Sequence, residues 1–313
     1  MSSPVPANQP AVAPRIVAAL QQAGLSPSMV AHVVGRALAE DLADGPDLTT
    51  TATIAADQQG RADAVPRQAG IVAGLAVMAF VFEVVGEGRV QVEIKAADGD
   101  IVDAGQVLLS ASGPVRDLLT AERTALNLLT HLSGIATLTR IWTDAVSGSA
   151  ARIRDTRKTL PGLRALEKYA VRCGGGVNHR MSLSDAALIK DNHVAAAGSV
   201  RAAFELVQTA AAELDRAQLE IEVEVDTPTQ CAEAIEAGAQ LILLDNMSLA
   251  DLKACVAMAA GKVKLEASGG LSLEVAGAVA ATGVDYLSIG ALTHSAPALD
   301  IGLDLTVGPA GRR

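Results

Sequence analysis

The stretch 240-QLILLDNMSLADLKACVAMAAGKVKLEASGG-270 decides the fold class of this chain. Two short apolar runs, 241–244 and 263–265, lie on either side of an alanine-rich segment of helical length. Each run leads into polar residues or glycine. A strand, a helix and a second strand in this order are typical of a parallel β/α unit.

The same rhythm recurs through the second half of the chain, with a strand about every 21 to 23 residues in the last four units. Six such units predict an α/β fold with a shortened or open TIM-like barrel of six to seven strands, over residues 149–295. The apolar runs are ARIRDT (151–156), AALIKDN (186–192), LEIEVEVD (219–226), QLILLDN (240–246), VKLEASGG (263–270) and DYLSIG (285–290).

The first half differs from the second. Residues 1–14 are rich in proline and alanine without a basic region, which indicates a disordered tail rather than a signal peptide. Two short helices are expected next, one after Pro14 and one with Ser26 as its N-cap and Pro27 at its first position. Strands are expected over about 60–112.

An apolar run over 69–82, AGIVAGLAVMAFVF, is too short to span a bilayer and predicts a buried helix among those strands. Further helices are expected from Pro114 to about residue 147. We therefore expect an N-terminal α/β sandwich domain over 15–148, to which residues 296–313 could return.

Composition excludes several classes of function. The net charge of −10 and an aromatic content of 2% argue against nucleic-acid binding. The three cysteines, Cys173, Cys231 and Cys255, form neither a disulfide framework nor a zinc spacing. A soluble protein without membrane contact, in the reducing cytoplasm, fits these features.

Basic residues gather in one part of this acidic chain. Residues 152–190 hold nine Lys or Arg against three acids, so the rest of the chain has 16 cations and 32 anions. Such a local excess predicts a pocket for a small polyanion. Within it, Arg164, Lys168 and Arg172 are spaced by four, which favours a solvated helix face over a subunit contact.

Polar residues stand where each predicted barrel strand ends, which is where β/α barrels carry their chemistry. In IEVEVD, the alternating Glu222, Glu224 and Asp226 share one face, directed to the barrel interior unless this is an exposed edge strand. These carboxylates would need Lys158, Lys190, Lys264 or Mg²⁺ opposite them. The strand-end residues are Thr156, Arg157, Lys158, Lys190, Asp191, Asn192, Glu224, Asp226, Asp245, Asn246, Ser268, Gly269, Gly270, Ser288, Gly290 and Ala291.

Two glycine-bearing turns, EASGG and LSIGAL, predict a phosphate site after the last two strands. The loop GGGVNHR ends in His179 and Arg180, candidate ligands for a carboxylate. Lys190 at a strand end could alternatively form a Schiff base.

These motifs together resemble the quinolinate phosphoribosyltransferase family from about residue 15 to 307. The similarity rests on EDLADGPDLTT, TAERTALNLLTHLSGIAT, DTRKTLPGLRALEKYAVRCGGGVNHR, IKDNH, EVEVD, LLDN, SGG and SIGALTHS. The resemblance implies transfer of phosphoribosyl from phosphoribosyl pyrophosphate to quinolinate with decarboxylation, Mg²⁺ as cofactor and a step of NAD synthesis. It also implies a head-to-tail homodimer, with hexamers as a further option.

The resemblance assigns roles to individual residues. Arg157, His179 and Arg180 would bind the quinolinate carboxylates, and Arg123 would reach into the neighbouring subunit's site. Lys158 and Lys190 would lie between the substrates as catalytic residues. Glu224 and Asp245 would hold the ribose and Mg²⁺-pyrophosphate. The remaining implied substrate ligands are Thr156, Ser268, Gly269, Gly270, Ser288, Gly290, Ala291 and His294.

Three other functions fit parts of the pattern. They are a Schiff-base aldolase using Lys190, a non-catalytic barrel that binds phosphorylated ligands, and a phosphoribosyltransferase that takes nicotinate without decarboxylation. The abundance of arginine over 157–180 favours a substrate with two carboxylates over nicotinate.

Overall fold

The computed structural model describes residues 12–308, which divide into two compact units. The first comprises the chain up to Leu138, a segment over 161–174 and the chain from Ala296; the second comprises 139–160 and 175–295. The division lies at 138/139, inside a helix, rather than at 148/149. Most of the expected N-terminal tail, residues 1–11, lies outside the described residues.

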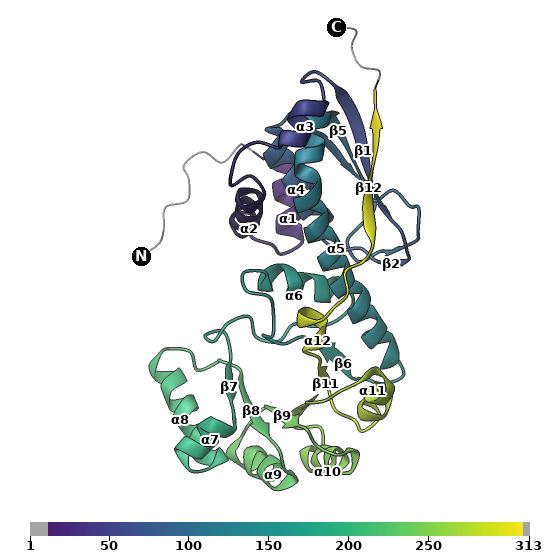
Figure 1. The fold of residues 1–313 in the computed structure, drawn as a ribbon. Helices are drawn as coiled ribbons and strands as arrows, with labels where there is room; N and C mark the ends of the chain where they lie inside the picture. Colours follow the sequence, from purple (N-terminus) through teal and green to yellow (C-terminus); the bar gives the residue numbers. More distant parts are fainter. Residues whose placement is uncertain (1–11, 309–313) are drawn as a thin grey trace. The chain divides into compact units, whose positions relative to one another are not determined.

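The first unit contains a four-stranded antiparallel sheet in the order β12-β1-β5-β3 (Figure 1). Its strands are β1 (Gln59–Pro66), β3 (Gln91–Ile94), β5 (Leu109–Pro114) and β12 (Ile301–Val307). Strand β12 pairs with β1 along its length, so residues 301–307 belong to this unit.

Three helices precede this sheet in the chain: α1 (Pro14–Gln22), α2 (Pro27–Asp41) and α3 (Leu48–Thr53). The predicted cap of α2 is confirmed, since the Ser26 hydroxyl accepts the Met29 N–H at 3.5 Å. A second cap, Asp47, accepts the Thr50 N–H at 2.9 Å and begins α3.

The apolar run over 69–82 is divided between two elements. Its start forms β2 (Gly70–Ile71), which pairs with β4 (Ile101–Val102), and helix α4 (Leu75–Gly86) begins only after Gly74. Gly74 has φ +103°, a left-handed conformation that glycine adopts without strain and that separates strand from helix. The predicted buried helix therefore exists but starts six residues later.

The helices predicted from Pro114 to residue 147 form one helix, α5 (Val115–Ala145), of 31 residues. Helix α6 (Arg164–Cys173) follows in the same unit. The prediction of a solvated basic face on α6 is wrong, because Lys168 is fully buried. Arg172 donates to the Ala23 carbonyl at 3.1 Å and lies over the Tyr169 ring. Its guanidinium group therefore also makes contacts within the first unit.

The second unit contains a six-stranded sheet in the order β6-β11-β10-β9-β8-β7, and all its neighbouring strands are parallel. Strands β6 and β7 are its two edges, so the barrel is open, as predicted. A bridge from Arg154 to Val177 adds a further short pairing at the β6 edge. The strands are β6 (Arg152–Arg154), β7 (Ala187–Ile189), β8 (Ile221–Val225), β9 (Leu241–Asp245), β10 (Lys264–Ser268) and β11 (Tyr286–Ser288).

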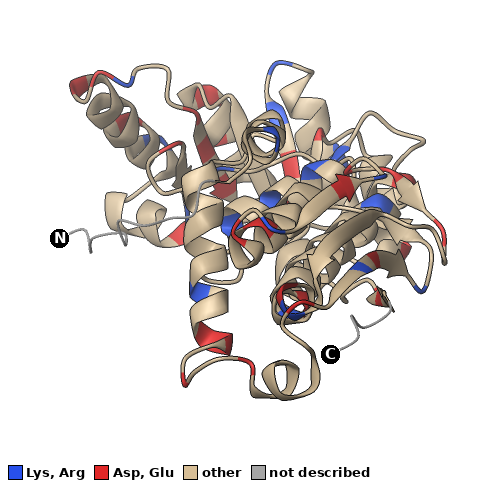
Figure 2. Ribbon diagram, turned by 90° about the horizontal axis from the view of Figure 1, so that it is seen from above, with Lys and Arg blue, Asp and Glu red and all other residues tan. Residues whose placement is uncertain are grey.

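Helices follow the strands of this sheet and lie around their outer side (Figure 1). Acidic and basic residues are interspersed along the ribbon (Figure 2). None of the helices within residues 12–308 is long and apolar enough to cross a membrane. The helices of this unit are α7 (Asp191–Ala197), α8 (Val200–Glu213), α9 (Pro228–Ala237), α10 (Leu249–Ala259), α11 (Leu273–Ala280) and α12 (Ala291–His294).

Asp98 in the first unit makes a pH-dependent contribution to stability. Its carboxylate accepts the Tyr169 hydroxyl at 2.6 Å and the Leu75 N–H at 3.0 Å, yet burial raises its pKa above the usual 3.8. The folded protein therefore holds this proton more tightly than the unfolded chain. Stability from this group is greatest below pH 3.8 and is lost as pH rises through the raised pKa, because the charged carboxylate is buried.

Asp98→Asn should remove this loss, so the variant gains stability relative to the parent as pH rises from 3 to 7. Urea denaturation at several pH values measures the difference. Asp47→Asn is the matched control with the opposite sign, because hydrogen bonds from Thr50 lower the pKa of Asp47. Parallel pH profiles for the two variants would contradict the prediction.

Candidate active site

The carboxyl ends of the parallel strands surround a cleft of about 630 Å³ in the second unit. The structure thus brings twelve of the site residues implied by the family resemblance to one place. Ten come from the ends of six strands, and His179 and Arg180 come from the loop before β7. Asn246, also a predicted strand-end residue, completes the lining with Leu188 and Leu243. The twelve are Thr156, Arg157, Lys158, His179, Arg180, Lys190, Glu224, Asp245, Ser268, Gly269, Gly270 and Ser288.

Lys190 and Glu224 form an ion pair at the rim of the cleft, with the ammonium 2.6 Å from Glu224 Oε2. Lys190 directly follows β7 and is the N-cap of α7, whereas Glu224 is the fourth residue of β8. The cation predicted opposite the β8 carboxylates is therefore Lys190. Lys264 is not such a partner, because it starts β10 and pairs with Asp285 at the other end of the sheet, at 2.6 Å.

Asn246 supports the glycine turn after β10. Its N–H donates to the Ser268 carbonyl at 2.9 Å, and its side-chain amide donates to Asp245 Oδ2 at 2.7 Å. It adopts a left-handed φ of +53°, which asparagine tolerates better than most residues. A Cβ on Gly269 would lie 2.3 Å from the Asn246 Oδ1, so the close approach of this turn requires glycine.

Gly290 lies against Lys158. A Cβ there would stand 3.0 Å from the Lys158 Cδ and 3.3 Å from the His294 Nε2. The Thr293 hydroxyl donates to the Lys158 carbonyl at 2.8 Å and holds α12 against this loop. Gly290, Ala291 and His294 therefore flank the cleft through Lys158, although they are absent from its lining residues.

Arg157 and Arg180 supply positive charge to the same wall. Burial, together with the neighbouring Arg157, lowers the pKa of Arg180. The Arg157 Nε is buried without a hydrogen-bond partner, and Arg180 Nη1 donates to the Ala186 carbonyl at 3.1 Å. Two guanidinium groups that line one cleft suit an anion with planar acceptors, so this wall is suited to carboxylates.

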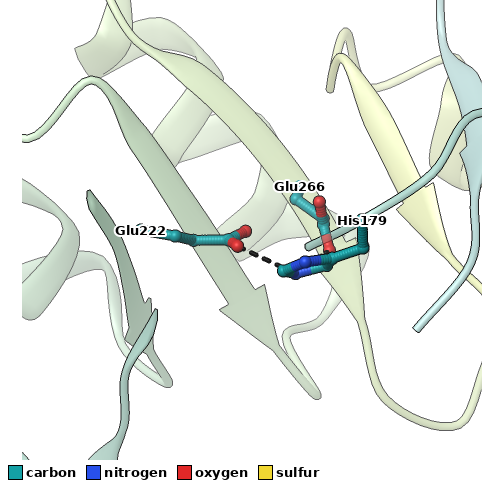
Figure 3. A group of neighbouring side chains, drawn as sticks. All are labelled: His179, Glu222 and Glu266. Carbon is teal, nitrogen blue, oxygen red and sulfur yellow. Dashed lines mark ion pairs between the residues drawn. The ribbon is translucent and has the colours of Figure 1, made fainter. Parts of the chain in front are cut away.

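A buried ionic cluster of Arg154, His179, Glu222 and Glu266 lies on the interior face of the sheet, and Figure 3 shows its His and Glu side chains directed toward one another. Arg154 Nη1 lies 2.5 Å from Glu266 Oε2 and 3.9 Å from Glu222 Oε1. Burial raises the pKa of Glu222 to about 7 and also raises that of Glu266. Opposite charges thus compensate one another inside the barrel.

Sequence reasoning missed Arg154 and Glu266 as members of this cluster. The signal was present, since both occupy alternate positions of their strands, as Glu222 and Glu224 do. Glu266 precedes Ser268 by two residues in β10, and Arg154 ends β6.

Two predicted site residues differ from the others in their surroundings. Arg123 is exposed on α5 in the first unit, and its expected reach into the site of a second copy stays a prediction. His179 is buried, its Nε2 lies 2.9 Å from Glu222 Oε2, and its Nδ1 accepts the Arg180 N–H at 2.7 Å. Because both ring nitrogens have partners in the protein, this geometry favours a supporting role for His179 over direct contact with a substrate carboxylate.

The acids at the cleft form a suitable set for a hard cation. Glu224 and Asp245 also line an adjoining cavity of about 290 Å³ together with Asp191 and Asp226. Carboxylate oxygens are the ligands that Mg²⁺ prefers, usually shared with substrate phosphates and water. The donor set therefore fits Mg²⁺.

Comparisons with known proteins agree with this geometry. Residues 135–304 match the family profile described as quinolinate phosphoribosyl transferase, C-terminal domain, and residues 47–133 match that of its N-terminal domain. The nicotinate-nucleotide pyrophosphorylase [carboxylating] of Mycobacterium leprae is 53% identical over 87% of this chain and 95% of its own length. Quinolinate phosphoribosyltransferase [decarboxylating] 1b of Nicotiana tabacum is 40% identical, covering 87% and 81%.

Among solved structures, NadC from Streptococcus pyogenes superimposes with a TM-score of 0.85 at 39% identity. The match covers 91% of this chain and 99% of that one. The family matches over 47–133 and 135–304 include every strand that bears the cleft, and the chain belongs to the quinolinate phosphoribosyltransferase family.

Proposed function

We propose that this protein transfers the phosphoribosyl group of phosphoribosyl pyrophosphate to quinolinate, with loss of CO₂. The products are nicotinate mononucleotide and pyrophosphate, which places the reaction in NAD synthesis. The observation that carries the proposal is that one cleft is lined both by two arginines, Arg157 and Arg180, and by acidic residues and glycines. The arginines suit a dicarboxylate, and the acidic residues and glycines suit a phosphorylated sugar with its metal.

Quinolinate would lie against Arg157 and Arg180, each presenting a planar set of donors to one carboxylate. Burial, and after it the neighbouring Arg157, lowers the pKa of Arg180, and a bound dianion would compensate this positive charge. Thr156 and Lys158 belong to the same wall and would add donors. Nicotinate has a single carboxylate, so it would leave one of the two guanidinium groups without a partner.

Phosphoribosyl pyrophosphate would place its 5-phosphate at the turn formed by Ser268, Gly269 and Gly270, where backbone N–H groups can approach closely. Ser288 lies at the end of the neighbouring strand β11. Glu224 and Asp245 would bind the ribose and the Mg²⁺-pyrophosphate. Mg²⁺ would neutralise the charge on the departing pyrophosphate.

The reaction requires positioning and electrostatics rather than a covalent nucleophile. The quinolinate nitrogen forms a bond to the anomeric carbon while the bond to pyrophosphate breaks. Positive charge on the ribose during this step is stabilised by Glu224 and Asp245. The ring nitrogen then carries positive charge, which stabilises the electron pair left on the adjacent carbon when CO₂ departs, and this carbon takes up a proton to give the product.

A homodimer would complete the site. Arg123 is exposed on α5, and we propose that it reaches the quinolinate wall of a second copy, adding a cation there. Assembly of dimers into hexamers is a further option. The reduced thiols Cys173, Cys231 and Cys255 suit a cytoplasmic setting.

The test is pyrophosphate release with quinolinate or nicotinate, each with and without Mg²⁺. We expect release with quinolinate and Mg²⁺, stoichiometric CO₂, and a large loss when Mg²⁺ is chelated. Equal rates with nicotinate and quinolinate would contradict the decarboxylating assignment. Absence of turnover with either would favour a non-catalytic barrel that binds phosphorylated ligands.

A Schiff-base aldolase is the main alternative chemistry, and the surroundings of Lys190 disfavour it. The Nζ lies 2.6 Å from Glu224 Oε2, so this nitrogen is engaged in an ion pair rather than available as the free nucleophile that a Schiff base requires. Borohydride treatment with candidate carbonyl substrates should leave Lys190 unmodified. A trapped adduct on Lys190 would instead support the aldolase function.

A further inference from the structure

His179 has an unambiguous arrangement of hydrogen-bond roles. Its Nδ1 accepts the peptide N–H of Arg180 at 2.7 Å, so this nitrogen carries no proton. The ring proton is therefore on Nε2, which lies 2.9 Å from Glu222 Oε2 and donates to it. A carboxylate on β8 thus determines the tautomer of a histidine that precedes the cleft arginine Arg180.

The backbone around His179 is fixed by a second acid. Asp155, fully buried, accepts the His179 N–H at 2.8 Å and the Asn178 side-chain amide at 2.5 Å. The Val177 N–H also donates to the carbonyl of Ile153, which lies within β6. These hydrogen bonds hold the backbone of residues 177–179 at the edge of the sheet. The His179 ring then determines the orientation of the Arg180 peptide.

The three residues His179, Glu222 and Glu266 bring their ligand atoms within 4.8 Å of one another, as in a metal site. The cation position is nevertheless taken by Arg154, whose Nη1 lies 2.5 Å from Glu266 Oε2. The Nε2 proton of His179 further opposes metal binding through that nitrogen. The cluster is therefore better described as a fixed ionic support than as a metal centre.

We infer that Glu222 is a positioning residue for the dicarboxylate end of the cleft. By accepting the His179 Nε2–H, it leaves Nδ1 free to hold the Arg180 peptide N–H and so fixes the direction in which the Arg180 side chain leaves the backbone. On the other side of Glu222, Arg154 Nη1 lies 3.9 Å from its Oε1 and is itself paired with Glu266. Glu222 itself does not line the cleft, so it acts on the substrate only through His179 and Arg180.

The effect on substrate binding should be selective. Without Glu222, the Nε2–H loses its 2.9 Å acceptor, and Glu266 Oε1 lies 3.8 Å away and already accepts the Ser288 hydroxyl. The ring then gains stability by rotating or by moving its proton to Nδ1. If Nδ1 of His179 carries the proton, it faces the Arg180 N–H as a second donor. The two donors repel each other, and the Arg180 peptide is displaced. Arg180 faces quinolinate in the proposed function, on which this step rests, whereas the phosphoribosyl donor lies at the glycine turn.

Glu222→Leu tests the inference, because leucine fills similar volume without an acceptor. We expect the KM for quinolinate to rise about tenfold or more, with the KM for phosphoribosyl pyrophosphate changed by less than about twofold. Glu222→Gln retains a carbonyl acceptor for Nε2–H and should restore the quinolinate KM to within about threefold. Equal increases in both KM values, or no change in a folded Leu variant, would overturn the inference.

Glu220 provides the matched control. It also pairs with Arg154, at 3.4 Å, but it is more than half exposed and has no contact with His179 in the ion pairs of the described residues. Glu220→Leu therefore removes a carboxylate partner of Arg154 without affecting the tautomer. The quinolinate KM should stay at the parent value, and an increase matching that of Glu222→Leu would mean that loss of Arg154 pairing is the cause.

A spectroscopic measurement separates this inference from the proposed function, because it needs no turnover. In ¹⁵N-labelled protein, the His179 signals, assigned by their loss in His179→Gln, should report protonation at Nε2 alone. Glu222→Leu should change this pattern, whereas Glu222→Gln should keep it. Protonation at Nδ1 in the parent protein, or a stoichiometric Zn²⁺ bound by the parent and lost in Glu222→Leu, would overturn the inference even if quinolinate is the substrate.

Discussion

Lys190→Ala is expected to lower kcat by about 10²–10³-fold, as removal of a fixed charge from a site of this kind does. Lys190 places its ammonium 2.6 Å from Glu224, in the part of the cleft where the two substrates would meet. Its loss removes a cation from the polyanion site and leaves the Glu224 carboxylate free to repel the pyrophosphate. Steady-state kinetics with quinolinate and phosphoribosyl pyrophosphate measure the effect.

Lys264→Ala is the matched control for this prediction. Lys264 forms an ion pair with Asp285 at the same distance of 2.6 Å, and both lysines are about half exposed or more. Lys264, however, begins β10, at the end of the sheet opposite the cleft. Its replacement should leave kcat within about twofold, since exposed pairs contribute little. A loss comparable to that of Lys190→Ala would mean that ion pairing, rather than position, sustains activity.

Gly134→Ala is expected to destabilise the first unit by about 3 kcal/mol. Gly134 lies in α5, where the backbone of Pro297 and Ala298 crosses the helix so closely that a Cβ would be 2.1 Å from the Pro297 carbonyl oxygen. The three nearest atoms all belong to the backbone of residues 297–298, so no side-chain rotation can relieve the clash. The crossing segment leads into β12 and must move with it. The midpoint of urea denaturation should fall accordingly.

Gly35→Ala separates this steric effect from helix propensity. Gly35 lies within α2, in the same unit, is exposed, and has no atom within 4 Å of the position of a Cβ. Alanine there should stabilise the protein by about 0.5–1 kcal/mol, because it has a smaller loss of backbone entropy on folding. Stabilisation by both substitutions would show that the segment 297–298 is not packed on α5 as observed.

The sequence predicted the barrel strands well because their signal is local. All six apolar runs of the second half form strands, and the open parallel barrel follows from their alternation with helices. The cleft residues could be found for a related reason, since the carboxyl ends of parallel strands meet at one edge. Boundaries failed where one apolar run serves two elements, as at Gly74, because hydrophobicity alone does not distinguish a buried strand from a buried helix.

Spacing alone gave a wrong account of charged residues. Arg164, Lys168 and Arg172 share a helical spacing that indicates a solvated face, yet Lys168 is fully buried. Lys264 was a possible counter-ion for the β8 carboxylates, yet it lies at the other end of its strand. Burial and pairing depend on which elements pack together, and a spacing within one element does not contain that information.

By itself the sequence determined the class of fold, the family and the set of strand-end residues that surround the cleft, because periodicity and strand order act over short distances along the chain. Only the tertiary structure decided which charges meet. Arg154 and Glu266 are 112 positions apart, yet their side chains lie in contact inside the barrel. Likewise, the pairing of His179 with Glu222 depends on how β8 packs against the loop that contains His179. A buried charge or donor is satisfied by whichever group the fold brings to it.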